Sequence, residues 1–135
     1  AQAALEAAQK YMNEREQFGK KLSDFQALQF KLADMTTELV AARHFVRLAA
    51  SKIDSKHSEA TVYSAMAKRF ATDVGFNVCN EALQIFGGYG YLQEFPLERY
   101  VRDVRVHQIL EGTNEIMRMI IGRRMLIENA TEIIQ

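Results

Sequence analysis

A run of apolar residues that recurs at alternate steps of three and four positions constrains the fold of this chain more than any other feature. The run consists of Phe25, Leu28, Leu32, Met35, Leu39, Ala42, Val46, Ala49 and Ile53. This spacing places all of them on one narrow side of a helix, as in a helical bundle or a coiled coil. Ser23 and Gln26 match a capping box at its start, and the short polar stretch 55–58 ends it in a tight helix–helix connection.

Four further segments also have the apolar spacing of helices. The first is the end of a helix, from residue 1 to about residue 16, and the others begin near Glu59, Pro96 and Thr113. The last of them is expected to run toward Ile134. Their expected buried residues are Leu5, Ala8 and Met12; Val62, Met66, Phe70, Val74, Val78, Ala82 and Ile85; Leu97, Tyr100, Val101 and Val104; and Ile116, Met119, Ile120, Ile127, Ala130 and Ile133.

The rest of the chain contains no signal for strands. Residues 13–22 mix charged side chains with Phe18, and we interpret them as a solvated helix end that stops at Gly19. No segment alternates polar and apolar residues with a period of two, so no sheet is predicted. Four long amphipathic helices and one short helix predict an all-α fold, an antiparallel four-helix bundle with a short extra helix.

Composition excludes several kinds of function. Lys and Arg number 17, as do Asp and Glu, and this balance argues against nucleic acid or an anionic membrane surface as the main partner. No apolar run approaches membrane-spanning length, so no membrane insertion is expected. The single cysteine, Cys79, cannot form an intrachain disulfide and favours an intracellular protein. The three histidines are scattered, and no metal site is expected.

Residues 109–116 carry the arrangement with the clearest chemical potential. Glu111 and Gly112 follow an apolar run, and Thr113 and Asn114 are good N-cap residues for the helix that comes next. Glu111 is thus a carboxylate at a bend, just ahead of the positive end of a helix dipole, where a general base could be held. Taken alone, the stretch is more typical of a glutamate that only complements the dipole. The glycines of residues 87–90 are a weak signal for a phosphate loop, since no Lys-Ser/Thr pair follows them.

In chain order, five landmarks resemble the C-terminal α-helical domain of the acyl-CoA dehydrogenases. They are Arg15-Glu16-Gln17-Phe18-Gly19-Lys20, Gln26, Gln84-Ile85-Phe86-Gly87-Gly88-Tyr89-Gly90-Tyr91, Arg102-Asp103 and Leu110-Glu111-Gly112-Thr113-Asn114-Glu115-Ile116. The resemblance covers nearly the whole chain. It implies that residues 1–135 are one domain of a longer protein, without its N-terminal helical and middle β domains, and that this piece alone does not turn over acyl-CoA.

The resemblance also implies an activity and a set of site residues. Family members carry FAD, convert an acyl-CoA thioester to the trans-2-enoyl-CoA and pass the electrons to an electron-transferring flavoprotein. Glu111 is then the catalytic base that takes the α-proton while hydride leaves the β-carbon for the flavin, and its backbone N–H binds the thioester carbonyl beside Gly112. The implied FAD contacts are Arg15, Gln17, Phe18, Phe25, Gln26, Gln84, Ile85, Phe86, Gly87 and Gly88, most of them to a neighbouring subunit's cofactor, and Gly112, Thr113, Asn114 and Glu115 to the subunit's own.

A cofactor shared in this way implies a homodimer or a homotetramer. The expected compartment is the bacterial cytoplasm or the mitochondrial matrix. Many members have Tyr at the position of Leu110 and Ser-Gln at the positions of Asn114 and Glu115, and the version in this chain is similar to that of short-chain and branched-chain members. A short or branched acyl group is therefore the expected substrate. Two alternatives stay open: an acyl-CoA oxidase, which passes electrons to oxygen, and a non-enzymatic helical assembly module.

Overall fold

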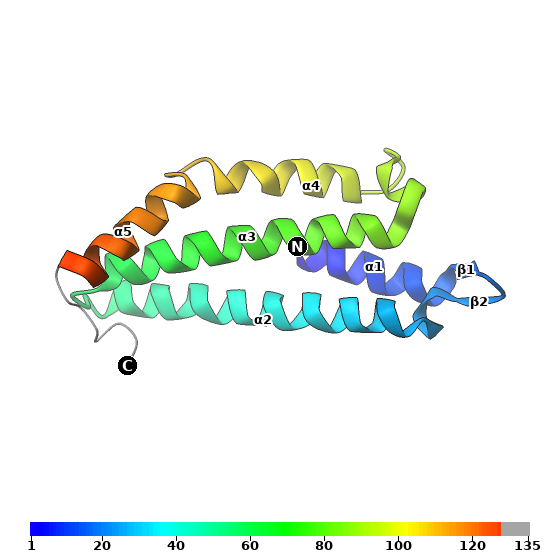
Figure 1. The fold of residues 1–135 in the computed structure, drawn as a ribbon, viewed down its shortest axis with the longest axis horizontal. Helices are drawn as coiled ribbons and strands as arrows, with labels where there is room; N and C mark the ends of the chain where they lie inside the picture. The colour runs from blue at the N-terminus through cyan, green and yellow to red at the C-terminus, as the bar shows by residue number, and fades with distance from the viewer. Residues whose placement is uncertain (128–135) are drawn as a thin grey trace.

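A computed structural model of the chain describes residues 1–127, and the predicted all-α fold is confirmed (Figure 1). The α-helices are α1 (Gln2–Glu14), α2 (Gln26–Asp54), α3 (Ala60–Phe86), α4 (Leu97–Arg105) and α5 (Asn114–Ile127). Short 3-10 helices η1 (Leu22–Asp24), η2 (Gly87–Tyr91) and η3 (Val106–Gln108) join them, together with strands β1 (Glu16–Gln17) and β2 (Lys20–Lys21). Over residues 1–127, no helix is long and apolar enough to cross a membrane.

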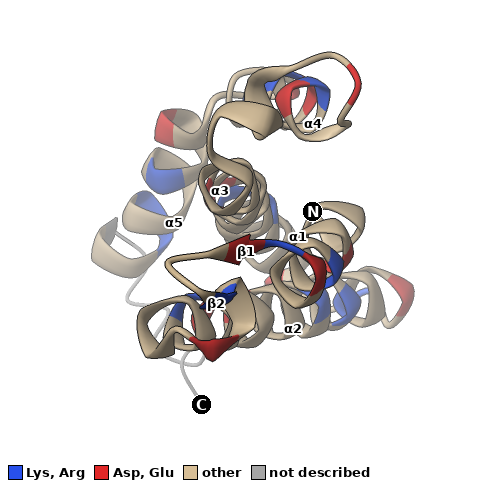
Figure 2. Ribbon diagram, turned by 90° about the vertical axis from the view of Figure 1, so that its right-hand side faces the viewer, with Lys and Arg blue, Asp and Glu red and all other residues tan. Residues whose placement is uncertain are grey.

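Helix α3 is the centre of the bundle. In the view along the bundle, α1, α2, α4 and α5 surround it (Figure 2). Helix α2 runs antiparallel to α3 on one side, while α4 and α5 follow one another along another side (Figure 1). The α3 residues Val78, Cys79 and Ala82 are completely buried, and all the predicted core positions of α3 and α4 are at least half-buried. Burial raises the pKa of the Cys79 thiol, so this cysteine packs as a small apolar side chain.

The predicted seam of α2 is confirmed along most, but not all, of its length. Met35, Ala42 and Ala49 are buried, whereas Val46 and Ile53 are 47% and 57% exposed. A strict 3.5-residue repeat drifts around a straight α-helix by about 20° per heptad, so the end of a long helix turns its seam away from the core. Phe45 packs against the core in place of its neighbour Val46.

The prediction that residues 13–22 form a solvated helix end, with no sheet, is wrong. Helix α1 ends at Glu14, and β1 and β2 form an antiparallel hairpin in which Gln17 pairs with Lys20. Phe18 and Gly19 make its turn with φ angles of 55° and 77°, the two positive values that a tight hairpin turn requires. Strands of two residues are too short to show a period of two, which is why the pattern missed them.

The capping box predicted at Ser23 and Gln26 is also wrong. Phe25 occupies the N-cap position of α2 and makes no side-chain capping hydrogen bond. The Asp24 carboxylate instead accepts the backbone N–H of Lys21 at 3.2 Å, and this bond stabilises the turn of η1. The carbonyl of Ser23 accepts the side-chain amide of Gln29.

Helix α5 begins where the sequence predicts, but its buried side differs from the prediction. Ile116 and Met119 are 43% and 42% exposed, whereas the neighbouring Met117 is 9% exposed and packs inward. The reason is Asn114, which is 3% exposed and fixes the rotation of the helix through its polar contacts with α3. The expected continuation to Ile134, with Ala130 and Ile133, lies outside the described residues, as does the side chain of Ile127.

Candidate functional site

The loop of residues 109–113 presents Glu111 in an uncommon backbone conformation. Glu111 and Gly112 are both left-handed, with φ angles of 59° and 88°. For a residue with a side chain this conformation costs about 1–2 kcal/mol, so the surrounding structure must hold it. A Cβ on Gly112 would lie 2.7 Å from Cε of Met117, and glycine is needed there for space as well. The Glu111 side chain is exposed, so a pocket around it requires walls from outside residues 1–127.

Thr113, Asn114 and Glu115, which follow Gly112, have different surroundings. Thr113 Oγ1 accepts the backbone N–H of Ile116 and caps α5. The Asn114 side chain is buried against α3, where it donates to Asp73 Oδ1 at 2.7 Å. Glu115 is exposed and lies 3.8 Å from Arg118 in an ion pair. Thr113 and Glu115 are thus partly or fully exposed at the start of the helix, with partners inside α5, whereas the buried Asn114 side chain bonds α3.

A second group of predicted residues surrounds a hollow of about 470 Å³ at one end of the bundle. Its walls come from the end of α1, the hairpin, and the junction of α3 with η2, which are far apart in the sequence. The lining residues are Tyr11, Arg15, Gln17, Leu22, Ile85, Phe86, Gly87, Gly88, Tyr89 and Leu92. Six of these, Arg15, Gln17, Ile85, Phe86, Gly87 and Gly88, are among the predicted cofactor contacts, and the fold brings them together.

The chemistry of this hollow fits part of a nucleotide cofactor. The Arg15 guanidinium lies over the Tyr89 ring, 5.2 Å from its centre, so a cation and an aromatic ring lie together in the lining of the hollow. Arginine binds phosphate oxygens in a bidentate manner, and aromatic rings stack on nucleobases. A Cβ on Gly87 or Gly88 would meet nothing within 4 Å, so the backbone there is open to a ligand. Charge, aromatic surface and open backbone together suit a diphosphate and an adenosine.

Four predicted contacts lie outside the lining of the hollow. Phe18 is 92% exposed at the tip of the hairpin, and its ring meets the edge of Phe25 at 6.3 Å. Gln26 is the exposed first residue of α2. The side chain of Gln84 is also exposed, while its carbonyl accepts the N–H of Gly87 at the end of α3. The hollow and the hairpin are at one end of the molecule, away from the loop of Glu111 (Figure 1).

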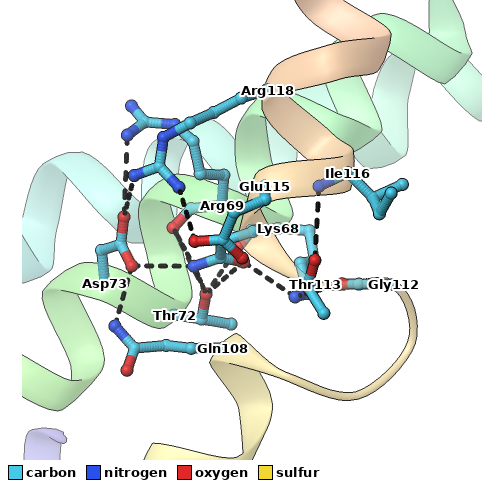
Figure 3. Close-up of polar contacts among 11 residues, drawn as sticks. Lys68, Arg69, Thr72, Asp73, Gln108, Gly112, Thr113, Glu115, Ile116 and Arg118 are labelled. Carbon is cyan, nitrogen blue, oxygen red and sulfur yellow. Dashed lines mark hydrogen bonds and ion pairs between the residues drawn. The ribbon is translucent and has the colours of Figure 1, made fainter.

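Sequence reasoning missed the α3 residues that hold the Glu111 loop. Lys68, Thr72 and Asp73 all make hydrogen bonds to the loop or to its flanking residues (Figure 3). The available signal was a polar stripe at positions 68, 69, 72 and 73 in a helix that is otherwise mostly apolar. Within residues 1–127, no group of three or more His, Cys, Asp or Glu side chains could hold a metal ion.

The chain belongs to the acyl-CoA dehydrogenase family: the model of the acyl-CoA dehydrogenase C-terminal domain matches residues 1–126, which confirms the predicted resemblance. Mitochondrial isobutyryl-CoA dehydrogenase of Bos taurus is 52% identical over 128 residues, which are 95% of this chain and 31% of that protein. The structure of butyryl-CoA dehydrogenase from Megasphaera elsdenii matches with a TM-score of 0.89 and 48% identity, over 93% of this chain and 32% of that one.

A second similar structure is described as the electron transferring flavoprotein of Acidaminococcus fermentans. It matches with a TM-score of 0.88 and 50% identity, over 93% of this chain and 33% of that one. The chain thus spans about a third of the length of the relatives that it matches.

Proposed function

We propose that residues 1–135 are the C-terminal catalytic and FAD-binding domain of a longer, flavin-dependent acyl-CoA dehydrogenase. The reaction is the α,β-dehydrogenation of an acyl-CoA thioester to the trans-2-enoyl-CoA. The observation that carries the proposal is the placement of Glu111, an exposed carboxylate in a left-handed bend three residues before α5. Membership of the acyl-CoA dehydrogenase family supports it.

In this proposal Glu111 is the base that takes the α-proton of the substrate. Its backbone N–H and the neighbouring Gly112 bind the thioester carbonyl, where a hydrogen bond stabilises the negative charge that develops as the proton leaves. A substrate that excludes water makes the carboxylate a stronger base, because desolvation disfavours its charged form. FAD, when bound, accepts the hydride that leaves the β-carbon, and the carbon–carbon double bond forms between the two positions.

The two separate surfaces support a cofactor shared between subunits. Arg15, Gln17 and the residues Ile85–Gly88 form the hollow that would receive the diphosphate and adenosine of a neighbouring subunit's FAD. Phe18, Phe25, Gln26 and Gln84 would make contacts around it, while Gly112, Thr113, Asn114 and Glu115 would lie beside the subunit's own FAD. The two surfaces belong to parts of the chain that lie apart in Figure 1, which favours contacts with two different cofactors. The proposed assembly is therefore a homodimer or a pair of homodimers.

The similar proteins favour one class of acyl-CoA substrate and one kind of electron acceptor. Identity of 52% to an isobutyryl-CoA dehydrogenase, together with Leu110 and Asn114-Glu115, favours a short or branched acyl group. The likeness to a chain of an electron transferring flavoprotein structure supports such a flavoprotein as the electron acceptor. Mitochondrial and bacterial relatives support the mitochondrial matrix or the bacterial cytoplasm as the compartment.

The decisive experiment is Glu111→Gln in the full-length protein. The amide has the size of the carboxylate but takes no proton, so turnover falls by about 10²–10⁴-fold while flavin stays bound. Bleaching of the flavin by isobutyryl-CoA, butyryl-CoA and longer thioesters identifies the substrate, and Glu6→Gln, an exposed change in α1, is the control. Retained turnover in Glu111→Gln contradicts the assignment, and rapid oxygen uptake without the flavoprotein acceptor indicates an oxidase instead.

A further inference from the structure

The two residues that flank the Glu111 loop are tied to the same carboxylate oxygen of α3. Gln108 Nε2 donates to Asp73 Oδ1 at 2.8 Å, and Asn114 Nδ2 donates to it at 2.7 Å (Figure 3). Asp73 Oδ2 also lies 3.3 Å from Arg118 and 3.6 Å from Arg69, so two guanidinium groups form ion pairs with the other oxygen of the same carboxylate. One aspartate therefore fixes the separation of the two ends of the loop.

A lysine one turn earlier in α3 holds the loop itself. Lys68 Nζ donates to the carbonyl oxygen of Gly112 at 2.7 Å and to Asn114 Oδ1 at 2.8 Å. Thr72 Oγ1 also contacts Asn114 Oδ1, at 3.2 Å, and accepts from Asn114 Nδ2 at 2.9 Å. The Lys68 ammonium thus bonds the peptide group directly after Gly112, and the buried Asn114 amide links Lys68 to Asp73.

Apolar packing does little to fix this loop. Ile109 and Leu110 are 51% and 38% exposed, and both Glu111 and Gly112 are exposed. A left-handed pair with so little burial persists only when its surroundings over-determine it. Charge-assisted hydrogen bonds are the strong kind, and in this loop the Lys68 bond falls on the carbonyl of Gly112, the residue directly after the left-handed Glu111.

We infer that Lys68 and Asp73 are positioning residues, which fix the backbone at Glu111 and Gly112 and thereby set where the catalytic carboxylate and its N–H meet the substrate. This inference rests on the proposed function only for its catalytic consequence. The mechanical part, that α3 side chains hold the loop, concerns this chain alone. Because a misplacement of about 1 Å can cost on the order of 10²-fold in rate, the effect on turnover is large even though neither side chain touches the substrate.

The test compares Lys68→Met with Lys68→Arg in the full-length protein. Methionine keeps the apolar stem but removes the donor, so hydrogen exchange of the amides in residues 109–114 accelerates by about tenfold or more. We expect kcat to fall by about 10–100-fold, while KM and flavin content stay within about twofold, since the ligand surfaces are retained. Lys68→Arg retains part of the protection from hydrogen exchange and part of kcat, because arginine offers donors of similar reach.

Lys31→Met is the matched control, because Lys31 is likewise a helical lysine with a polar partner from another part of the chain, the Glu81 carboxylate, away from the loop. It leaves loop exchange and kcat unchanged. Asp73→Asn is a second variant, which keeps an acceptor but loses the charge and gives an intermediate effect. Unchanged loop exchange in Lys68→Met overturns the inference, and so does faster exchange throughout α3, which indicates general destabilisation.

The catalytic part has its own test. If Glu111→Gln abolishes turnover but Lys68→Met leaves kcat unaltered, the positioning role is overturned. If Glu111→Gln keeps turnover, the proposed function fails, while the exchange measurement still decides whether Lys68 holds the loop.

Discussion

Arg124 binds the Glu59 carboxylate through two nitrogens, with Nε at 2.7 Å from Oε2 and Nη2 bonded to Oε1. Glu59 directly precedes α3 and is 5% exposed, while Arg124 lies in the last turns of α5. The pair therefore joins the start of the central helix to the end of the described chain. The hydrogen bond from Arg124 holds the pKa of Glu59 below its ordinary value of 4.5, against the opposing effect of burial.

This pair predicts a particular dependence of stability on pH. A carboxyl group whose pKa is lower in the folded state stabilises that state fully above the unfolded value, and the contribution disappears as pH falls through the folded value. Glu59→Gln should thus lower the melting temperature most near neutral pH and least below the folded pKa. Thermal unfolding from neutral to acid pH measures it, with the exposed Glu115→Gln as the control. If Glu59→Gln lowers the melting temperature by the same amount at every pH from neutral to acid, the pKa of Glu59 is not lowered by folding and the prediction is wrong.

Two glycine-to-alanine changes compare the backbone of the Glu111 loop with that of a regular helix. Gly112→Ala puts a side chain on a residue with φ of 88° and drives its Cβ against Met117, so we expect a loss of about 1–2 kcal/mol in unfolding free energy. Gly122 lies inside α5, where an added Cβ would meet nothing within 4 Å, and Gly122→Ala should add about 0.5–1 kcal/mol. Chemical denaturation measures both, and equal effects in the two variants would argue against the strain.

Leu97 is the completely buried side chain that attaches α4 to the core. Leu97→Ala should cost about 2–5 kcal/mol, the usual range for a leucine whose cavity cannot collapse fully. Leu126 is 83% exposed in α5, and Leu126→Ala should change stability by less than about 0.5 kcal/mol. Urea denaturation of both variants checks the contrast, and a small loss for Leu97→Ala means that α4 packs more loosely than the burial of this leucine indicates.

Phe18 offers a test of the hairpin that leaves the fold intact. The ring is 92% exposed and φ is 55°, a conformation that asparagine accepts more easily than phenylalanine. Phe18→Asn should therefore keep or slightly raise the melting temperature of the chain. If Phe18 contacts FAD as proposed, the full-length variant binds flavin about tenfold more weakly, as is typical on losing an aromatic contact residue. Flavin release on dilution, followed by fluorescence, measures this; unaltered retention removes Phe18 from the site.

Periodicity in the sequence identified the long helices because each continues for many turns. The apolar positions of Val74, Val78 and Ala82 repeat every four residues, and all three are buried. The predicted rotation of α5 was wrong because it was based on hydrophobicity, which placed Ile116 inward. The buried amide of Asn114 determines which side of the helix faces α3. A polar residue that sets the orientation of a helix gives no signal in an apolar pattern.

The candidate site could be predicted only in part, and for a related reason. The landmark motifs gave six of the residues that line the hollow, but periodicity alone gave no sign that Arg15 and Gly87 would line the same hollow. The contact of Lys68 with Gly112 spans 44 positions, and no local rule connects them. Long-range polar contacts depend on the packing of several helices at once, so they become visible only in three dimensions.

The hollow at the end of the bundle exists only while α1 lies against α3, since each helix contributes one side of it. Tyr11 of α1 stacks on Phe86 of α3 with ring centres 4.0 Å apart, so the same aromatic contact that docks the helix also shapes the binding surface. If the hollow receives the nucleotide as proposed, a newly synthesised chain with α1 undocked would have no place for it. Cofactor uptake would then select subunits in which α1 has already folded onto the bundle.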